Sequence, residues 1–434
     1  MRNVFLSVLG TSNYVPCNYM GYKNIRFIQE ATIASNCQNW LTEDRIYILT
    51  TDAAYDANWL NGGHKGTEVG LKSRLERLNL SAKLDYVSIP LGESVDEIWG
   101  IFETIYGLIE EDDNVVFDIT HAFRSLPMLA IVVLNYAKAM KNINLQGIYY
   151  GAFEVLGSPR YVEDNVPVEE RNVPVFDLSA FDMLMDWSFA VDHFIKAGDA
   201  SAISALAKKE IKPVLAESKG RNENARSTDQ LAKALEKFTR VMATCRGRMI
   251  SDTVERLRAC LAESYSINDI KPFQPIVERL RDQVESSFCG ETVPDGFNAA
   301  RWCLNHNLIQ QGYTILQETL FSYLLIKAGL DPHEDRYRDI PSQALKIYSS
   351  RKSDEPIEKA DWHSPACDYP EITERIIRIL PGDPDFTKQM HRISQERNDL
   401  NHAGQNQNAY VSPEKFSRNL ATHINYMEQL VSEE

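Results

Sequence analysis

Residues 114–140 read NVVFDITHAFRSLPMLAIVVLNYAKAM and contain one complete unit of the pattern that decides the fold. The first seven residues form a short β-branched run, which predicts a buried strand, and residues 127–140 carry apolar side chains at helical spacing. Further strands are expected at residues 3–10, 45–51, 83–90 and 145–153, with helices at 23–36, 69–80 and 95–110 between them. This alternation predicts a Rossmann-like α/β domain with a mainly parallel, doubly wound sheet and right-handed crossovers.

The pattern changes near residue 180, after which strand signals almost disappear. Long amphipathic segments are expected to be helices at residues 182–199, 228–264 and 297–330, around Arg397, and at 414–433. Two polar stretches, residues 217–229 and 350–371, are expected to be exposed loops. The sequence therefore predicts a sheet domain at residues 1–180 and an all-helical domain at residues 181–434.

The overall composition indicates a soluble globular protein, with 44% hydrophobic and 25% charged residues among 434. Its net charge of −15 argues against a protein that coats long stretches of nucleic acid, although a small local phosphate site remains compatible with it. The seven cysteines occur singly and without a zinc-like spacing, so a reducing cytoplasm and no metal site are expected. No apolar run is long enough to predict a membrane span.

Two loops of the expected sheet are rich in hydrogen-bond donors. If the strand order is 3-2-1-4-5, the loops after the first and fourth strands meet where the order reverses, which is where such sheets bind ligands. The candidate binding residues in these loops are Gly10, Thr11, Ser12, Asn13, Thr120, His121, Phe123, Arg124 and Ser125. Either loop alone is equally consistent with a structural turn and helix cap. There is no GxGxxG or GxxxxGK[ST] motif, so a conventional dinucleotide or ATP site is not expected.

A second candidate site is the stretch RNDLNHAG at residues 397–404. It closes a segment in which Phe386, Met390, Ile393 and Leu400 lie on one helical stripe. Arg397 falls within that stripe. A guanidinium on an apolar face requires an anionic partner, so the sequence predicts an anion beside this helix.

The two candidate sites together resemble a known protein family. LGTSNY (residues 9–14) and DITHAFRSLP (residues 118–127) resemble the ligand loops of CARF domains, which are sensors of cyclic oligoadenylate in type III CRISPR-associated proteins. RNDLNHAG resembles the signature of HEPN ribonucleases, in which four to six residues separate an arginine from a histidine. The resemblance covers nearly the whole chain in the family's order. It implies a cyclic tetra- or hexa-adenylate activator, a homodimer or higher homo-oligomer with a composite active site, and no cofactor.

The chemistry of the motif is consistent with cleavage of single-stranded RNA. RNA carries its own nucleophile, the 2′-hydroxyl, so cleavage needs a group that exchanges protons near neutral pH and a cation beside the phosphate. His402 is expected to be the general acid or base, Arg397 the phosphate clamp and Asn398 the orienting group. This site would work without a metal and leave a 2′,3′-cyclic phosphate.

One geometric condition must be met. Five positions along a straight helix place Arg397 and His402 on different faces, so the helix is expected to end near Gly404. Asn305, His306 and Gln310 lie on another helical segment, where interior hydrogen bonding is the expected role.

Three alternatives stay open at this point. The chain could be a regulatory protein that binds cyclic oligoadenylate and uses the helical domain as a dimerisation scaffold, with Arg397 in a structural ion pair and His402 at a helix end. The sheet domain could also degrade its activator, with Thr11, Ser12 and His121 taking part. The ring size and the RNA base preference are likewise open.

Overall fold

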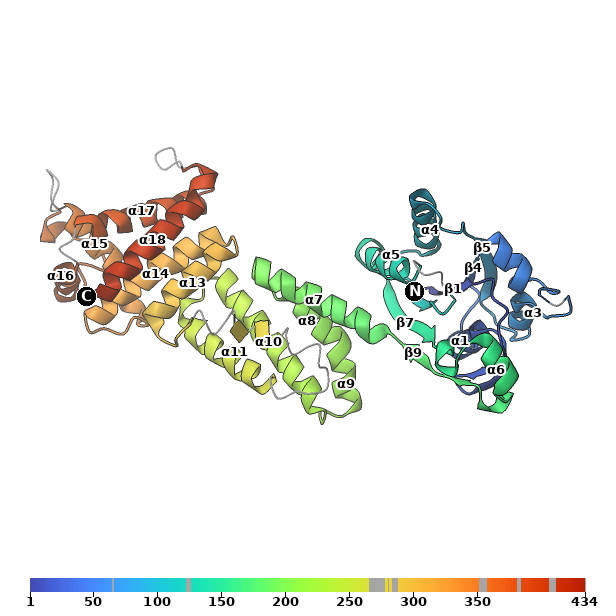
Figure 1. Ribbon diagram of the computed structural model, residues 1–434. Helices are drawn as coiled ribbons and strands as arrows, with labels where there is room; N and C mark the ends of the chain where they lie inside the picture. The colour runs from blue at the N-terminus through green and yellow to red at the C-terminus, as the bar shows by residue number, and fades with distance from the viewer. Residues whose placement is uncertain are drawn as a thin grey trace. The chain divides into compact units, whose positions relative to one another are not determined.

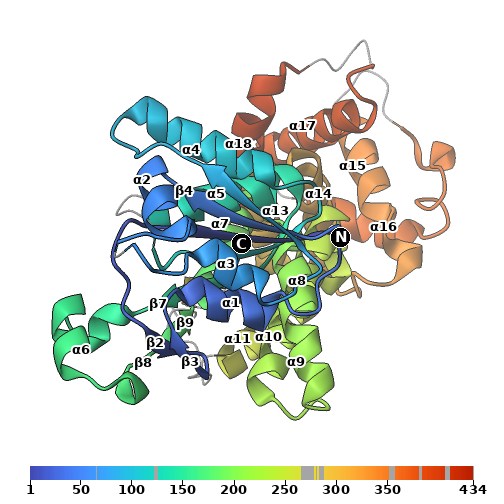
Figure 2. The same ribbon diagram turned by 90° about the vertical axis from the view of Figure 1, so that its right-hand side faces the viewer.

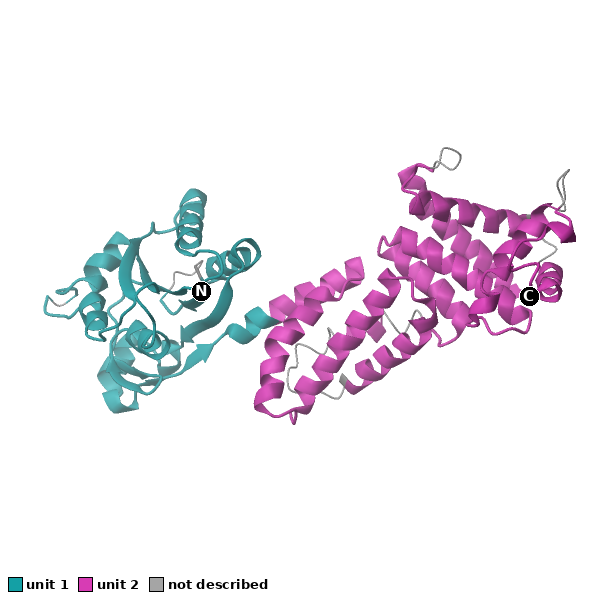
Figure 3. Cartoon of the chain, turned by 180° about the vertical axis from the view of Figure 1, so that it is seen from behind, with its two compact units in different colours: residues 1–183 teal, residues 184–434 magenta. Residues whose placement is uncertain are grey.

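The computed structural model describes residues 1–64, 66–121, 126–264, 278–279, 281–282, 288–350, 357–380, 384–405 and 411–433. The chain forms two compact units, residues 1–183 and 184–434 (Figure 3).

Unit 1 is built on a six-stranded sheet with the order β5-β4-β1-β6-β7-β9 (Figure 1). Its strands, with those of a smaller sheet, are β1 (Asn3–Leu9), β2 (Cys17–Tyr19), β3 (Tyr22–Ile25), β4 (Arg45–Thr50), β5 (Lys83–Ser88), β6 (Asn114–Asp118), β7 (Asn144–Gly151), β8 (Asn172–Val173) and β9 (Val175–Asp177). In this sheet each of the neighbouring pairs β5-β4, β4-β1, β1-β6 and β6-β7 is parallel, and β9 pairs antiparallel with β7. The five parallel strands, numbered along the chain, follow the order 3-2-1-4-5, so the predicted α/β sheet is confirmed.

Helices cover both faces of this sheet (Figure 2). The helices of unit 1 are α1 (Ile28–Asn36), α2 (Asp52–Ala54), α3 (Leu71–Glu76), α4 (Val95–Leu108), α5 (Leu126–Lys141) and α6 (Pro159–Asn165). On β1, Val4 and Leu6 share one core with α4 and α5, whereas Phe5 and Leu9 share the other with α1 and α3. Alternate side chains of the strand point to opposite faces, which produces the doubly wound arrangement.

The predicted helix at residues 23–36 is wrong in its first part. Residues Tyr22–Ile25 form β3, which pairs with β2, and α1 begins only at Ile28. The turn between these strands is Met20-Gly21, and both residues have positive φ angles of 51° and 85°. Positive φ at both central residues is typical of a two-residue hairpin turn, and such a turn fixes the strand pairing.

Unit 2 is helical, as predicted for the second half of the chain. Its helices are α7 (Ser179–Ala197), which begins in unit 1, α8 (Ser201–Leu206), α9 (Lys212–Glu217), α10 (Glu223–Ala243), α11 (Ile250–Ser264), α13 (Thr292–Asn305), α14 (Ile309–Lys327), α15 (Ile340–Ser350), α16 (Pro370–Ile379), α17 (Pro384–Asn401) and α18 (Pro413–Glu433). Helix α14 is mostly buried and packs against α13 and α15 to α18 (Figure 1). None of the described helices is both long and apolar enough to cross a bilayer.

The two predicted exposed loops are partly wrong. Residues from Glu223 onward belong to α10, because Asn222 caps that helix by accepting a hydrogen bond from the Ala225 N–H at 2.9 Å. In the second stretch Trp362 and Ala366 are buried, while residues 351–356 lie outside the described residues. Polar composition alone therefore did not distinguish a capped first helical turn from a loop.

Candidate functional site

The loops that follow β1 and β6 lie against each other. A Cβ atom placed on Gly10 would come within 2.6 Å of the Tyr14 Oη atom and 3.5 Å of the His121 carbonyl oxygen. The rings of Tyr14 and His121 have centroids 4.1 Å apart. The structure thus brings the first candidate loop and the beginning of the second together at the point where the strand order reverses.

The first loop is held by its backbone and leaves its small side chains exposed. The Asn58 side-chain amide donates to the carbonyl oxygens of Gly10 at 2.8 Å and Ser12 at 3.0 Å. The Gly10 N–H donates to the Tyr14 Oη atom at 3.0 Å. Thr11 and Ser12 are exposed to solvent. Their hydroxyls therefore project from a fixed backbone and are accessible to a ligand.

Asn13, the last candidate in this loop, is positioned by a buried arginine. Arg26 is only 6% exposed, donates to the Asn13 Oδ1 atom at 3.1 Å and forms an ion pair with Glu68 at 2.5 Å. Among the described residues, the Arg26 Nε atom is buried without a hydrogen-bond partner. The sequence analysis did not select Arg26, Glu68 or Asn58. The sequence feature that could have pointed to Arg26 is its position as a charged residue between the apolar residues Ile25 and Phe27.

In the second loop, Thr120 has a structural role. Its hydroxyl donates to the Asp118 Oδ1 atom at 2.6 Å and accepts a hydrogen bond from the Gly151 N–H at 2.9 Å. Asp118 is fully buried and also accepts a hydrogen bond from the Thr32 hydroxyl at 3.0 Å. Burial raises the pKa of Asp118, although the hydrogen bonds from Thr120 and Thr32 act in the opposite direction. The Thr120 hydroxyl is thus engaged with the protein and shapes the loop.

His121 is neutral at physiological pH. Burial lowers the pKa of its imidazole to about 3, and its Nε2 atom is buried without a hydrogen-bond partner among the described residues. The ring can therefore offer a hydrogen bond to a ligand but no positive charge. Phe123, Arg124 and Ser125, the other candidates in this loop, lie outside the described residues.

The second candidate site lies at the end of α17, where the predicted apolar stripe is found. Phe386, Met390 and Ile393 are buried. Arg397, which continues the stripe, is half-buried, and its Nε atom is buried without a partner among the residues that the structure describes. Asn398 is exposed on the same helix. Among the described residues, no ion pair of Arg397 is found.

His402 is the first residue beyond α17. Its N–H donates to the Asn398 carbonyl oxygen at 2.9 Å, and the chain then turns through Ala403 and Gly404, which have φ angles of 53° and 69°. The Gly404 N–H closes the turn by donating to the Asp399 carbonyl oxygen at 2.9 Å. The helix therefore ends close to the predicted position. The His402 side chain is exposed, and in the described part of the chain no hydrogen bond joins it to Arg397.

The sequence analysis missed a buried network one residue before Arg397. The Glu396 carboxylate accepts hydrogen bonds from the Asn419 amide at 2.8 Å and from the Tyr313 hydroxyl, and it lies 3.2 Å from the His423 Nε2 atom. Burial raises the pKa of Glu396, but the hydrogen bonds from His423, Tyr313 and Asn419 outweigh it and leave the pKa below its ordinary value. These contacts fix α17 to α14 and α18.

The residues set aside on the neighbouring segment have mainly structural contacts. His306 is buried, with Nδ1 2.8 Å from the Trp302 carbonyl oxygen and Nε2 3.1 Å from the Ile195 carbonyl oxygen, so the expected interior role is found. Gln310 differs, because its amide donates to the Asn401 Oδ1 atom at 2.9 Å, directly beside His402. Asn305 is exposed.

Comparisons with known proteins give a partial match. Residues 183–288 match the model of the second domain of CRISPR-associated protein MJ1674. The curated protein of that name from Methanocaldococcus jannaschii is 26% identical to the chain over 237 residues. The chain is a relative of a CRISPR-associated protein. The similarity covers 54% of this chain but only 33% of the relative, and the matched domain contains neither the sheet loops nor RNDLNHAG.

Proposed function

We propose that this chain is a metal-independent endoribonuclease of the CARF–HEPN kind, which cleaves single-stranded RNA when cyclic oligoadenylate binds its sheet unit in CRISPR antiviral defence. The observation that carries the proposal is the end of α17, where a half-buried arginine precedes an exposed histidine at the helix end; the Nε atom of that arginine has no partner among the residues that the structure describes. The similarity to a CRISPR-associated protein supports the setting, and the paired loops of unit 1 support a ligand site.

In this proposal each residue of the motif has one chemical task. His402 exchanges the proton of the 2′-hydroxyl or of the leaving oxygen, and its exposure lets RNA reach the imidazole. Arg397 neutralises the phosphate as charge develops in the transition state. Asn398, one residue along the helix, orients the phosphate. Because RNA supplies the nucleophile, the products are a 2′,3′-cyclic phosphate and a 5′-hydroxyl, and no step requires a metal.

A homodimer would bring an arginine and a histidine of the motif together although Arg397 and His402 of one chain point in different directions. Two copies of the α17 end, brought together, place the arginine of one chain near the histidine of the other, and the scissile phosphate becomes the missing anion. A symmetric ring of four or six adenylates would bind across the loops of two sheet units, with Thr11, Ser12, Asn13 and Arg124 contacting ribose hydroxyls and phosphates.

The second candidate is a cyclic-oligoadenylate-binding regulatory protein whose helical unit is a scaffold. The Glu396 network favours it, because a well-bonded buried carboxylate beside Arg397 also suits a purely structural helix end. A cleavage assay separates the two candidates: labelled single-stranded RNA is incubated with the protein, with and without cyclic tetra- or hexa-adenylate, and with EDTA. The first proposal expects ring-dependent cleavage that resists EDTA. If no RNA is cleaved under any condition, the regulatory protein with a helical scaffold is the candidate that remains.

A further inference from the structure

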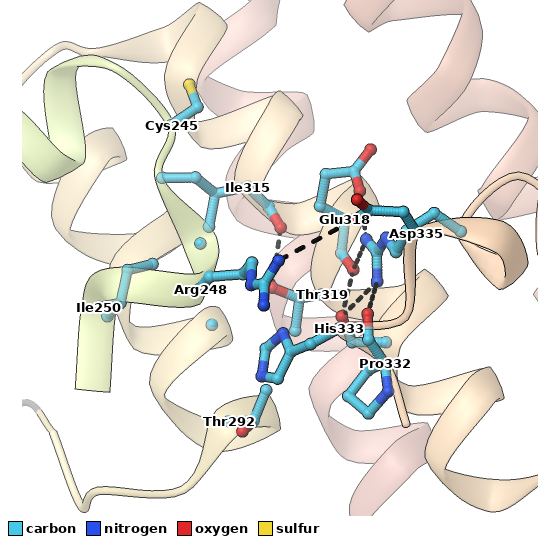
Figure 4. A pocket seen from close by; sticks show the side chains of 14 residues that line it. Cys245, Arg248, Ile250, Thr292, Ile315, Glu318, Thr319, Pro332, His333 and Asp335 are labelled. Carbon is cyan, nitrogen blue, oxygen red and sulfur yellow. Dashed lines mark hydrogen bonds and ion pairs between the residues drawn. The ribbon is translucent and has the colours of Figure 1, made fainter. Parts of the chain in front are cut away.

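Unit 2 contains a cavity of about 270 Å³ beside the middle of α14 (Figure 4). The cavity is lined by residues of the turn before α11, of α13 and α14, and of the segment that follows α14. Residues that matter for its chemistry are Cys245, Arg248, Thr292, Ile315, Thr319 and His333. Its volume is near the lower limit of small-molecule sites, which begin at roughly 300 Å³, so it would hold one small group rather than a long segment.

One of the charged groups that line the cavity is fully engaged by the protein. Arg338 donates to the Ser322 hydroxyl at 2.9 Å and to the carbonyl oxygens of Pro332 at 3.2 Å and Glu318 at 3.1 Å. It also forms an ion pair with the Glu318 carboxylate. Arg338 therefore builds the wall of the cavity, and its charge is neutralised there.

Arg248 is far less engaged. Its side chain is 67% exposed, and its nearest carboxylate, Asp335, is 3.9 Å away and 97% exposed. An ion pair of this kind contributes little in water. His333 is half-buried, Thr292 is exposed, and Figure 4 shows both beside Arg248. Among the described residues, no hydrogen bond from the side chains of His333 or Thr292 is found. A cation, an aromatic ring and a hydroxyl thus face the same space.

The opposite wall of the cavity is aliphatic. Ile250 and Ile315 line it and are buried in the helical core, each with 3% of its surface exposed. A flat ring can pack against such a wall and against an imidazole, and a guanidinium binds phosphate oxygens. The combination of an apolar slot and a weakly paired cation at its edge fits a nucleotide better than a purely apolar or purely anionic ligand.

One edge of the cavity lies near the first turn of α14. Cys245, which lines it, has its Sγ atom 4.0 Å from the Gln311 carbonyl oxygen. The preceding residue, Gln310, donates its side-chain amide to Asn401 at 2.9 Å, and His402 follows Asn401. Cys245 thus connects one edge of the cavity to the first turn of α14, which contacts the residue before His402.

We propose that this cavity binds one nucleotide of the RNA strand next to the bond that is cut, with the base against Ile315 and His333 and a phosphate on Arg248. This inference rests on the proposed ribonuclease function. It assigns base preference to the cavity, because its walls and hydroxyls contact the base, while the motif contacts the phosphate and the ribose hydroxyl but no base.

The test measures nucleotide binding without cleavage. The full-length His402→Ala protein is titrated with AMP, GMP, CMP and UMP by calorimetry. At least one of the four is expected to bind, and Arg248→Ala in the same background should weaken that binding by tenfold or more. Thr292→Trp, which places a large ring at the exposed rim, should do the same without disturbing the core. Arg240→Ala is the matched control, since this exposed arginine of α10 pairs with Glu236 and does not line the cavity.

The outcomes separate this inference from the proposed function. Loss of binding in both cavity variants, with binding retained in the control, supports the cavity as a nucleotide site even if the wild-type protein cuts no RNA. If RNA is cut, the same two variants should raise KM and change the base preference while kcat stays within a few-fold. No binding of any monophosphate, or binding unchanged by both cavity variants, would overturn the inference even if the protein is an active ribonuclease. If AMP still binds to the Arg248→Ala protein, the binding site is not the cavity, and the loops of the sheet unit are the site to test next.

Discussion

Removal of the Glu396 carboxylate should destabilise unit 2 strongly. The side chain is 12% exposed and has polar contacts with Tyr313, Asn419 and His423. Glu396→Ala removes the acceptor of Asn419 and the partner of the buried His423, and Tyr313 keeps only the Phe416 carbonyl oxygen; breaking a buried, hydrogen-bonded carboxylate network of this kind costs about 3 to 5 kcal/mol. At about 2 to 4 °C for each kcal/mol in a domain of this size, the Tm should fall by about 6 to 20 °C.

The measurement is thermal unfolding of the full-length protein, followed by circular dichroism or calorimetry, with the transition of the helical unit identified. Glu255→Ala is the matched control, because Glu255 is an exposed glutamate of α11 and its removal should change stability by less than about 0.5 kcal/mol. A Tm for Glu396→Ala within 2 °C or so of wild type would refute the claim that this carboxylate joins α17 to α14 and α18.

The stability that the Glu396 carboxylate contributes depends on pH, and Glu396→Gln tests this dependence. The folded pKa of Glu396 lies below its ordinary value of 4.5, because the hydrogen bonds outweigh the effect of burial. A depressed carboxylate pKa gives stability that is fully present above the ordinary value and is lost as the pH falls through the folded value. The difference in Tm between wild type and Glu396→Gln should therefore be constant from pH 7 to about pH 5 and shrink below pH 4.5.

Three further predictions address the loops and the arginine. Asn13→Ala or Arg124→Ala should move the activation curve to higher cyclic oligoadenylate while saturating ligand restores most of the cleavage; a lower maximal rate at unchanged ligand affinity would remove these residues from the pocket. Asp118→Asn should raise the Tm of unit 1 at pH 7, because burial raises the pKa of Asp118 and the ionised form is disfavoured; the gain should shrink toward pH 3.8, and a lower Tm at pH 7 would contradict it. Arg397→Ala should abolish cleavage and also alter helical packing or dimerisation, measured by light scattering, whereas a normal oligomer and Tm would place the arginine outside the interface.

The sequence predicted the main sheet because its strands are continuous apolar runs whose character does not depend on distant partners. Residues 23–25 are predicted to begin a helix because they carry no strand alternation, and in the structure Lys23 and Asn24 are exposed. Their strand exists through pairing with β2, which itself pairs with β8 more than 150 residues later. Pairing over such distances leaves no local pattern.

Sequence alone pointed to the candidate residues where several polar or charged side chains occur within a short stretch, as in RNDLNHAG. The residues that hold them were missed, because each acts across the fold: Asn58 reaches the β1 loop from 46 residues away, and His423 reaches Glu396 from 27 residues away. A buried glutamate is indistinguishable in sequence from a solvated one. Burial and partner geometry, which only the structure provides, decide between them.

The central claim is that RNDLNHAG is a catalytic motif, and His402→Ala tests it most directly. His402 is the residue of that motif proposed to act as general acid or base, and it is exposed beyond the end of α17, so its removal should leave the fold intact. With saturating cyclic oligoadenylate, RNA cleavage should fall by at least the roughly 10² to 10⁴ typical of general acid–base catalysis, while ring affinity stays within a few-fold. A folded, ring-binding His402→Ala protein that cuts RNA at the wild-type rate would contradict the account.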